Sequence, residues 1–332
     1  MRVFAAGCVT LWLVAALPAQ EWPRFRGPNG SGVSAATLPT SWTEKDYRWQ
    51  VKLPGPGHSS PILWGERLFV TSQADGKLRV LCLDAGTGRT HWNVPLATTA
   101  PRGHKDNNLA SSTPSADEKH VYVAWGTPKE TVLLALTHDG KEAWRRDLGP
   151  YRPGHGFGSS PMVHGDLVIL TCEDNGKDCL VAVESATGKE RWRVARKSRN
   201  TYATPCIYQP MGRAEMPAEL IAVSYEDGIT SLDPRTGKLH WAADVFDKRH
   251  VEASIASPIV HGDLVLGSSG WLSVRYETIA VRSRMGKIEK AFVLERDPPL
   301  VPTPIAKDDL LFLWNDRGIV TCCDVQTGQR YW

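Results

Sequence analysis

The sequence predicts an all-β fold assembled from repeated four-stranded units. Tryptophan content is the first indication, because 13 of the 332 residues are tryptophan, against 7 phenylalanines and 8 tyrosines. A short signature ending on an aromatic residue then recurs at intervals of 40 to 52 residues. Between its copies lie apolar runs bounded by Asp, Asn and Gly, which are typical of short strands. Units of this length arranged radially form a β-propeller, so one domain can reach this size by repetition.

The signature in its fullest form is Asp-x-x-Thr-Gly-(Lys/Arg)-x-x-Trp. Five copies read DAGTGRTHW, HDGKEAW, ESATGKERW, DPRTGKLHW and DVQTGQRYW, and a degenerate sixth reads RMGKIEKAF. The acid can accept hydrogen bonds from nearby backbone amides, and the glycine can adopt the positive φ of a tight turn. The aromatic residue starts the next strand and can pack against the neighbouring unit. We expect six tryptophans in this docking role: Trp49, Trp92, Trp144, Trp192, Trp241 and Trp332.

Each unit also opens in a similar way, with SSP, STP, SSP, ATP, ASP or PTP. Proline suits the first residue of a strand, because it removes a donor where the ladder begins. Two apolar runs separated by a turn follow each opening, as in RLFVTS and LRVLCLD around QADGK, and no stretch has a helical period. The predicted units are 49–92, 93–144, 145–192, 193–241, 242–292 and 293–332.

The first 19 residues predict a secretory signal peptide. Arg2 precedes an apolar run from Val3 to Leu17, and Ala19 offers a small residue for cleavage. The run is short for a membrane span, and no later stretch reaches 18 apolar residues. We therefore expect an exported protein, periplasmic or extracellular, without a transmembrane segment. Residues 20–48 form an N-terminal extension before the propeller of residues 49–332.

Charge and cysteine content narrow the partners and the chemistry. A formal charge of +3 over this length does not indicate nucleic acid as a partner. Among the six cysteines after the signal, only Cys172 and Cys179 have a geometric case for a disulfide. If Asn175 and Gly176 form a two-residue turn, the two cysteines lie opposite each other on paired strands. They are either bridged or two packed thiols.

The repeat resembles the tryptophan-docking repeat of the pyrroloquinoline quinone (PQQ)-like propellers over residues 49–332. That superfamily contains quinoprotein dehydrogenases and non-enzymatic members, such as a lipoprotein that assists outer-membrane protein assembly. The stretches EWPRFRGPNGSGVS, NNLASSTP and GHGFGSSP look like an exported subgroup of largely unassigned function. The resemblance implies eight blades, of which about six are present here. Trp49 looks like a closing strand, and Trp332 stands at the start of a fourth strand, so we expect a C-terminal truncation of the ring.

Polar and cationic side chains recur in the segments that enter successive units. If those segments are the loops from one blade to the next, their side chains converge near the axis on one face and suit an anionic or polyhydroxyl ligand. Alternatively, these residues satisfy the backbone of ordinary surface loops. The histidines either hydrogen-bond within the loops or chelate a metal, and we assign no metal site. The candidate ligand face comprises His58, Arg102, His104, Asn107, Asn108, Arg152, His155, Arg199, Asn200 and His250.

These observations favour a monomeric, non-catalytic binding or scaffolding module, whose protein partner or polar ligand meets that face. We find no nucleophile elbow, zinc motif, haem attachment site or phosphate loop, and we assign no catalytic residue. The alternative implied by the resemblance is a PQQ-dependent alcohol or sugar dehydrogenase with calcium, an aspartate base and a tryptophan floor. Adjacent Cys322 and Cys323 invite that comparison, but successive strand side chains face opposite ways. A third possibility is a structural repeat domain from a larger envelope protein.

Overall fold

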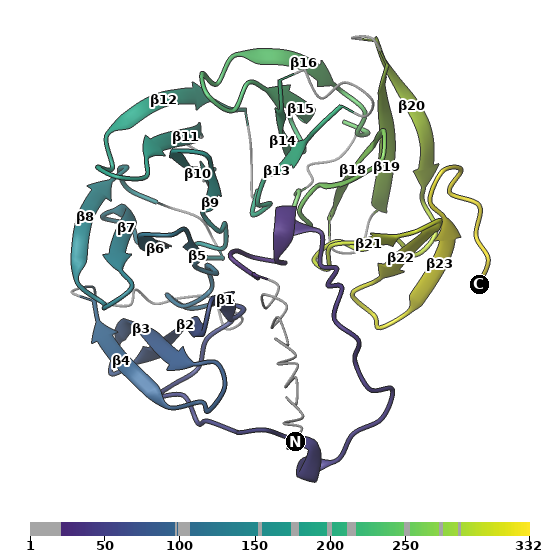
Figure 1. The fold of residues 1–332 in the computed structure, drawn as a ribbon. Helices are drawn as coiled ribbons and strands as arrows, with labels where there is room; N and C mark the ends of the chain where they lie inside the picture. The colour runs from purple at the N-terminus through teal and green to yellow at the C-terminus, as the bar shows by residue number, and fades with distance from the viewer. Residues whose placement is uncertain are drawn as a thin grey trace, which may run out of the picture.

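The computed structural model describes residues 21–96, 98, 107–151, 155–173, 179–197, 201–210, 217–248, 253–271, 275–284 and 287–332. Six antiparallel sheets lie around a common axis, as Figure 1 shows, so the predicted all-β propeller is confirmed. Five of these sheets have four strands and the sixth has three. The predicted signal peptide, residues 1–19, lies outside the described residues.

Every sheet is a meander in which strands follow one another from the axis outward. The first two sheets contain β1 (Ile62–Trp64), β2 (Arg67–Ala74), β3 (Lys77–Asp84), β4 (Thr90–Pro95), β5 (Ser115–Ala116), β6 (His120–Gly126), β7 (Thr131–Thr137) and β8 (Glu142–Asp147). The next two contain β9 (Met162–His164), β10 (Leu167–Cys172), β11 (Cys179–Glu184), β12 (Glu190–Ala195), β13 (Cys206–Tyr208), β14 (Glu219–Ser224), β15 (Gly228–Leu232) and β16 (Leu239–Ala243). The last two contain β17 (Ile259–His261), β18 (Leu264–Trp271), β19 (Arg275–Arg284), β20 (Lys287–Leu294), β21 (Ile305–Lys307), β22 (Leu310–Trp314) and β23 (Val320–Asp324).

The hydrophobic core is divided among the junctions between adjacent sheets. One cluster joins sheets one and two through Phe69 and Trp125, and another joins sheets two and three through Tyr122 and Val168. Three further clusters join the remaining neighbours in order. Each sheet therefore buries its faces against the sheets beside it, as radial packing requires.

The signature turns fold as their residue types dictate. Asp84 Oδ1 accepts hydrogen bonds from the Thr87 amide at 2.8 Å and the Thr87 hydroxyl at 2.6 Å. Asp324 makes the same two bonds to Thr327, both at 2.8 Å. Gly88 has a φ of 72°, in the region that glycine adopts without strain.

Four tryptophans pack on the signature glycine of the following unit. A Cβ added to each of these glycines would stand within 2.9 Å of a tryptophan ring. The pairs are Gly88 with Trp49, Gly140 with Trp92, Gly188 with Trp144 and Gly237 with Trp192. Their indole Nε1 atoms donate to the carbonyls of Ala85, His138, Ser185 and Pro234 at 2.8–3.1 Å. Phe292 takes the same position against Gly328. The missing Cβ thus provides the space into which the preceding unit inserts its ring.

The other two predicted docking residues have different surroundings. Trp241 donates to the Glu219 carboxylate at 2.8 Å within its own sheet, and the turn it would meet at residues 285–286 lies outside the described chain. Trp332 is 60% exposed. Trp49 docks as described and is not paired in any sheet of the described chain. That it forms a closing strand stays a prediction, because none of the described sheets contains the partner strands expected for it. Near the last residue, Arg330 forms a bridge with Cys323, beside β23.

The Ser/Thr-Pro openings build a hydrogen-bonded girdle around the axis. In each junction, the amide of one opening donates to the hydroxyl of the corresponding residue in the next, over 2.9–3.1 Å. The residues of the girdle, in order, are Ser60, Thr113, Ser160, Thr204, Ser257 and Thr303. One repeated contact therefore links all six sheets just before their innermost strands begin.

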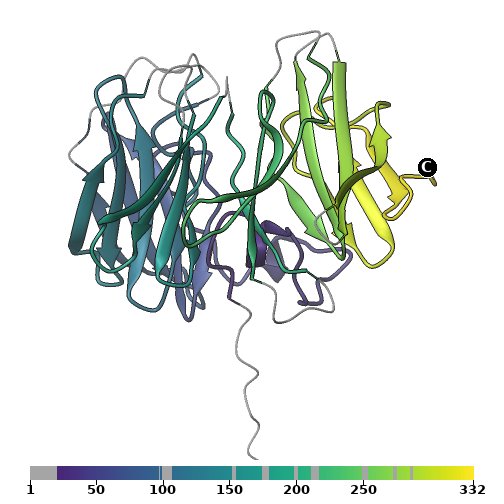
Figure 2. The same cartoon turned by 90° about the horizontal axis from the view of Figure 1, so that it is seen from above.

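The N-terminal segment crosses the centre of the ring (Figure 2). Trp22 pairs with Leu63 of β1 through two backbone bonds of 3.0 and 2.9 Å. The short 3₁₀ helix η1 (Pro28–Gly30) follows, and Asn29 exchanges two bonds of 2.7 Å with Ile207 of β13. The chain then passes through η2 (Glu44–Asp46) and reaches the first sheet across the sector beside the sixth (Figure 1).

Candidate functional site

The candidate site is the loop face. We define it as the described residues of the segments that enter the first five sheets: 55–61, 107–114, 155–161, 201–205 and 253–258. These segments run toward the axis, where the Pro205 carbonyl at the end of the fourth accepts a hydrogen bond of 2.6 Å from Arg24 of the N-terminal segment. Each segment contacts the one that enters the next sheet. The following paragraphs take these contacts in order around the axis.

Between the first and second segments, backbone and side-chain amides make the contact. The amides of His58 and Ser59 both donate to the Ala110 carbonyl at 2.9 Å. Asn108 Nδ2 donates to the Pro56 carbonyl at 3.4 Å, while Asn108 Oδ1 accepts from the Ala110 amide at 2.8 Å. The Asn108 side chain is thus engaged in loop structure, and the His58 side chain is exposed.

Asn107 makes the next junction. Its Nδ2 donates to the Phe157 carbonyl at 3.5 Å, and its Oδ1 accepts from the Ser111 hydroxyl at 2.5 Å. Gly156 has a φ of 85°, and a Cβ added to it would stand 3.0 Å from the side-chain amide of Asn107. His155, the residue before that glycine, is exposed. The structure therefore places Asn107 against the loop that carries His155.

Tyr202 connects the third, fourth and fifth segments. Its ring lies 3.2 Å from the position of a Cβ on Gly158, and its amide donates to the Ser254 carbonyl at 3.1 Å. The Tyr202 hydroxyl is buried without a hydrogen-bond partner in the described chain. Burial raises the pKa of this phenol to about 12, so it is a neutral donor at physiological pH. An unpaired buried hydroxyl is costly, which marks Tyr202 as a candidate contact for a polar ligand.

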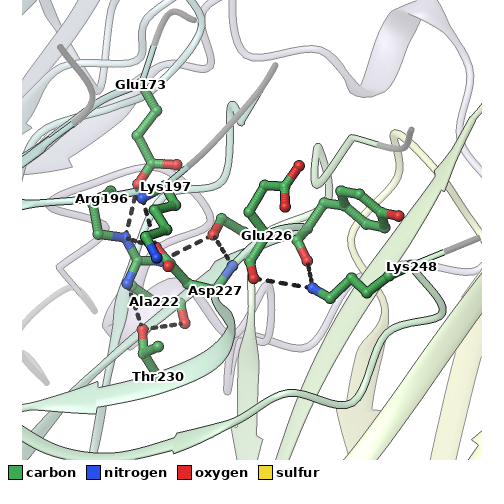
Figure 3. A network of polar contacts seen from close by, with 10 residues as sticks. Glu173, Arg196, Lys197, Ala222, Glu226, Asp227, Thr230 and Lys248 are labelled. Carbon is green, nitrogen blue, oxygen red and sulfur yellow. Dashed lines mark hydrogen bonds and ion pairs between the residues drawn. The ribbon is translucent and has the colours of Figure 1, made fainter. Parts of the chain in front are cut away.

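A buried ion-pair network anchors the loop that carries Tyr202 (Figure 3). Arg196 Nε lies 3.1 Å from Glu173 Oε1 and 3.3 Å from Asp227 Oδ2. Its two other nitrogens donate to Thr230 Oγ1 at 2.8 Å and to Ser224 Oγ at 3.3 Å. The Arg196 and Glu173 side chains are 4% and 1% exposed, so this is a desolvated pair with charge-assisted bonds.

The network fastens the end of β12 to two sheets at once. Glu173 follows β10 of the third sheet, whereas Thr230 belongs to β15 of the fourth. Asp227 also accepts from the Lys197 amide at 3.1 Å, which fixes the start of the loop (Figure 3). Nearby, Lys248 Nζ donates to the carbonyls of Tyr225 and Glu226. Arg196 therefore fixes the end of β12 rather than offering its charge to a ligand.

Six predicted members of the ligand face lie outside the described residues: Arg102, His104, Arg152, Arg199, Asn200 and His250. The described members are His58, Asn107, Asn108 and His155. Sequence reasoning missed Glu173 and Asp227 as anchors, because they lie 23 and 31 residues from Arg196 in the sequence. The available signal was an acid that directly follows a mainly apolar strand, as Glu173 follows LVILTC.

The described residues do not fit a calcium-bound quinone. Calcium takes oxygen ligands, yet the amide oxygens of Asn107 and Asn108 already accept hydrogen bonds from their own loop. The docking tryptophans of β4, β8 and β12 lie in outer strands, away from the axis (Figure 1). No group of three or more metal-ligating side chains occurs among the described residues. Cys322 and Cys323 pair with Phe312 and Leu311 as ordinary buried strand residues.

A cavity of about 630 Å³ lies between the fifth and sixth sheets. Leu294 of β20, Leu313 of β22 and Thr321 of β23 line it together with Arg330, and none of its lining residues belongs to the loop face. Within the described chain, no helix is both long and apolar enough to span a bilayer.

Comparison with known proteins gives the family. A family model described as outer membrane protein assembly factor BamB matches residues 40–101 and 76–332. The chain belongs to this family. BamB of Yersinia pestis is 29% identical over 136 residues, which cover 41% of this chain and 31% of that protein. The crystal structure of BamB from Moraxella catarrhalis has a TM-score of 0.60 at 15% identity, covering 86% of this chain and 75% of that one.

Dehydrogenases are relatives of the same chain. Polyvinylalcohol dehydrogenase of a Pseudomonas species is 24% identical over 267 residues, or 75% of this chain and 38% of that protein. The structure of quinohemoprotein alcohol dehydrogenase ADHIIG from Pseudomonas putida has a TM-score of 0.56 at 12% identity, covering 86% and 67% of the two chains. The chain thus spans less than two fifths of the curated relatives named here. The resemblance to PQQ-like propellers is confirmed.

Proposed function

We propose that this propeller is an exported, non-catalytic binding or scaffolding module whose partner meets the loop face. The observation that carries the proposal is the ring of loop contacts from Pro56 to Ser254. Because each entering loop is hydrogen-bonded or packed on the next, the face is preorganised, which lowers the entropic cost of binding. His58 and His155 are exposed on this face.

The chemistry of the face favours a polar or anionic ligand, or a protein surface that presents such groups. Histidine ring nitrogens can form hydrogen bonds with polar and anionic groups. The Tyr202 hydroxyl adds a neutral donor. Membership of a family described as an outer membrane protein assembly factor supports a protein partner. The predicted signal peptide supports export, and we propose that the module acts as a monomer.

The test compares histidines on and off the face. A photo-crosslinking residue at position 58 or 155 should capture a defined partner in the native exporting host, whereas the same residue at position 240 should not. His240 is a suitable control because it is exposed on the outer strand β16. In parallel, citrate and phosphate binding is measured by NMR. If citrate or phosphate changes NMR chemical shifts only at the loop face, and the double variant His58→Ala, His155→Ala abolishes those changes, the ligand is a small anion. Equal crosslinking from positions 58, 155 and 240 would contradict the loop-face assignment.

A PQQ-dependent oxidoreductase is the second candidate, favoured by the dehydrogenase relatives. It is tested by adding PQQ and calcium to the purified protein and measuring dye-linked oxidation of alcohols and sugars. The binding-module proposal expects no turnover and no stoichiometric quinone absorbance. Stoichiometric quinone binding with turnover would replace it.

A further inference from the structure

Two buried cysteines face each other near the end of the β10–β11 hairpin. Cys172 is directly opposite Cys179 in the strand register, and the two are 8% and 3% exposed. Directly opposed residues on antiparallel strands have α-carbons about 4.5–5.5 Å apart, which lies within the range that a disulfide spans. A hydrogen bond already joins the two sulfur groups. The backbone is therefore arranged for a bond between them.

A cation is aimed at one member of the pair only. Arg193 of β12 places Nη1 3.1 Å from Cys179 Sγ. The same guanidinium is held by Glu190, with Nε 3.2 Å from Oε1 and Nη2 2.8 Å from Oε2. Because this two-point contact fixes the guanidinium plane, the positive charge of Arg193 is held in one position. It favours negative charge on Cys179 Sγ.

The titration of the two thiols follows that asymmetry. The Cys172 S–H and the Arg193 guanidinium lower the pKa of Cys179, whereas the same hydrogen bond and burial raise the pKa of Cys172. Glu173 disfavours charge on both sulfurs, whereas Arg193 favours it and hydrogen-bonds Cys179 Sγ. By contrast, burial raises the pKa of Cys206 to about 12 and that of Cys82 to about 11. A thiolate beside a neutral thiol is the reactive arrangement in disulfide exchange.

We propose that Cys172 and Cys179 form a thiol–disulfide exchange site, with Cys179 as attacking thiolate, Cys172 as resolving thiol and Arg193 as positioning cation. The Cys179 thiolate attacks a disulfide oxidant, so one sulfur of the oxidant bonds to Cys179 and the other leaves as a thiol with a proton. Cys172 then loses its proton and attacks Cys179 Sγ, which expels the second thiol. The two protein thiols are oxidised by two electrons, and the oxidant disulfide is reduced to two thiols.

The first experiment maps the bond. Fully reduced protein is incubated with glutathione disulfide near neutral pH, quenched with acid, alkylated and digested for mass spectrometry. The wild type should lose two hydrogens and give a peptide pair joined through Cys172 and Cys179. Cys206→Ser, which changes a buried thiol in the next sheet, should bridge equally well. Free thiols at both Cys172 and Cys179 after exposure to an excess of glutathione disulfide, or a bridge between other cysteines, would overturn the proposal without any variant.

The second experiment assigns the roles. Cys172→Ser should stop at a glutathione adduct on Cys179, because the resolving thiol is missing. Cys179→Ser should form an adduct on Cys172 at least about tenfold more slowly, since the remaining thiol has no positioned cation. Equal adduct rates in the two variants would refute the assignment of Cys179 as nucleophile. Circular dichroism checks that both variants keep the strand content of the wild type.

The third experiment isolates the positioning residue. In the Cys172→Ser background, Arg193→Gln should move the pH midpoint of Cys179 alkylation by iodoacetamide upward, while Arg193→Lys should retain part of the shift. A merely structural role of Arg193 would change stability but leave the midpoint where it was. An unchanged midpoint in Arg193→Gln would therefore remove the cation from the proposal.

Discussion

The docking of a tryptophan on a glycine can be tested with two glycines that share a backbone conformation. Gly237 and Gly165 both have a positive φ, of 71° and 58°. A Cβ on Gly237 would stand 2.8 Å from the Trp192 ring and 2.8 Å from Val194 Cγ2, whereas a Cβ on Gly165 would meet nothing within 4 Å. The two alanine variants therefore share backbone strain and differ in the contact with the preceding unit.

The expected costs follow from that difference. A left-handed conformation costs a non-glycine residue about 1–2 kcal/mol, which is the whole effect expected for Gly165→Ala. Gly237→Ala adds overpacking of about 1–3 kcal/mol, because the ring must move out of its site. Trp192 is 8% exposed and donates to the Pro234 carbonyl at 3.1 Å. Trp192→Ala should cost about 3–5 kcal/mol as a buried anchor.

Urea titration followed by far-UV circular dichroism measures these costs without relying on the tryptophan that is removed. The decisive comparison is a double-mutant cycle, since Gly237→Ala should cost about 1–3 kcal/mol less in the Trp192→Ala background than in the wild type. If Gly237→Ala and Gly165→Ala cost the same within about 0.5 kcal/mol, or if the double variant is additive, the steric docking described here is wrong. A loss under about 0.5 kcal/mol for Trp192→Ala would have the same meaning.

Three further predictions concern the girdle, the ion-pair network and the signature turns. Thr204→Val leaves a buried amide without its acceptor and should cost about 1–3 kcal/mol in urea titration, whereas Thr204→Ser should cost less than about 1 kcal/mol. Arg196→Met leaves the Glu173 charge buried and should cost about 3–5 kcal/mol, part of which a second change, Glu173→Gln, should recover. Hydrogen bonds from Thr87 lower the pKa of Asp84, so this stabilisation is present above the unfolded pKa and is lost as pH falls through the folded one. Thr87→Val should therefore flatten the fall in melting temperature below about pH 4.

The repeat made much of the fold predictable from sequence. A glycine preceded by Thr, or by Asp in one copy, forms a tight turn locally, and its recurrence before a tryptophan places that turn at the same point of five units. Local chemistry repeated five times is thus enough to define the sheets. The opening Pro was also interpretable as a strand start, whereas the hydroxyl before it was not. Its partner is the amide of the preceding unit, 44 to 53 residues away, and a girdle bond of this kind has no local signature.

The candidate site was less predictable because its geometry depends on distant pairs. Polar residues in the entering loops indicated a common face, but the role of each depends on which neighbour it meets. The side-chain amides of Asn107 and Asn108 donate hydrogen bonds to adjoining loops. Tyr202 keeps a buried hydroxyl free of partners in the described chain. Polar loop residues that look equivalent in the sequence, such as Asn108 and Tyr202, can therefore differ in whether their polar atoms are already hydrogen-bonded within the described chain.

The N-terminal segment shows why the centre of the ring needs more than the repeats. The innermost strand of each sheet has an edge toward the axis, and unpaired strand edges invite other chains. The segment supplies partners there: Trp22 pairs with Leu63, the Pro23 carbonyl accepts from Ala116, and Arg24 donates to the Pro205 carbonyl at 2.6 Å. Burial lowers the pKa of Arg24 to about 10, so its charge persists at neutral pH and is satisfied by a carbonyl from the fourth sheet. Since one continuous stretch of chain contacts the first, second and fourth sheets, the N-terminal segment is part of the packing of the propeller.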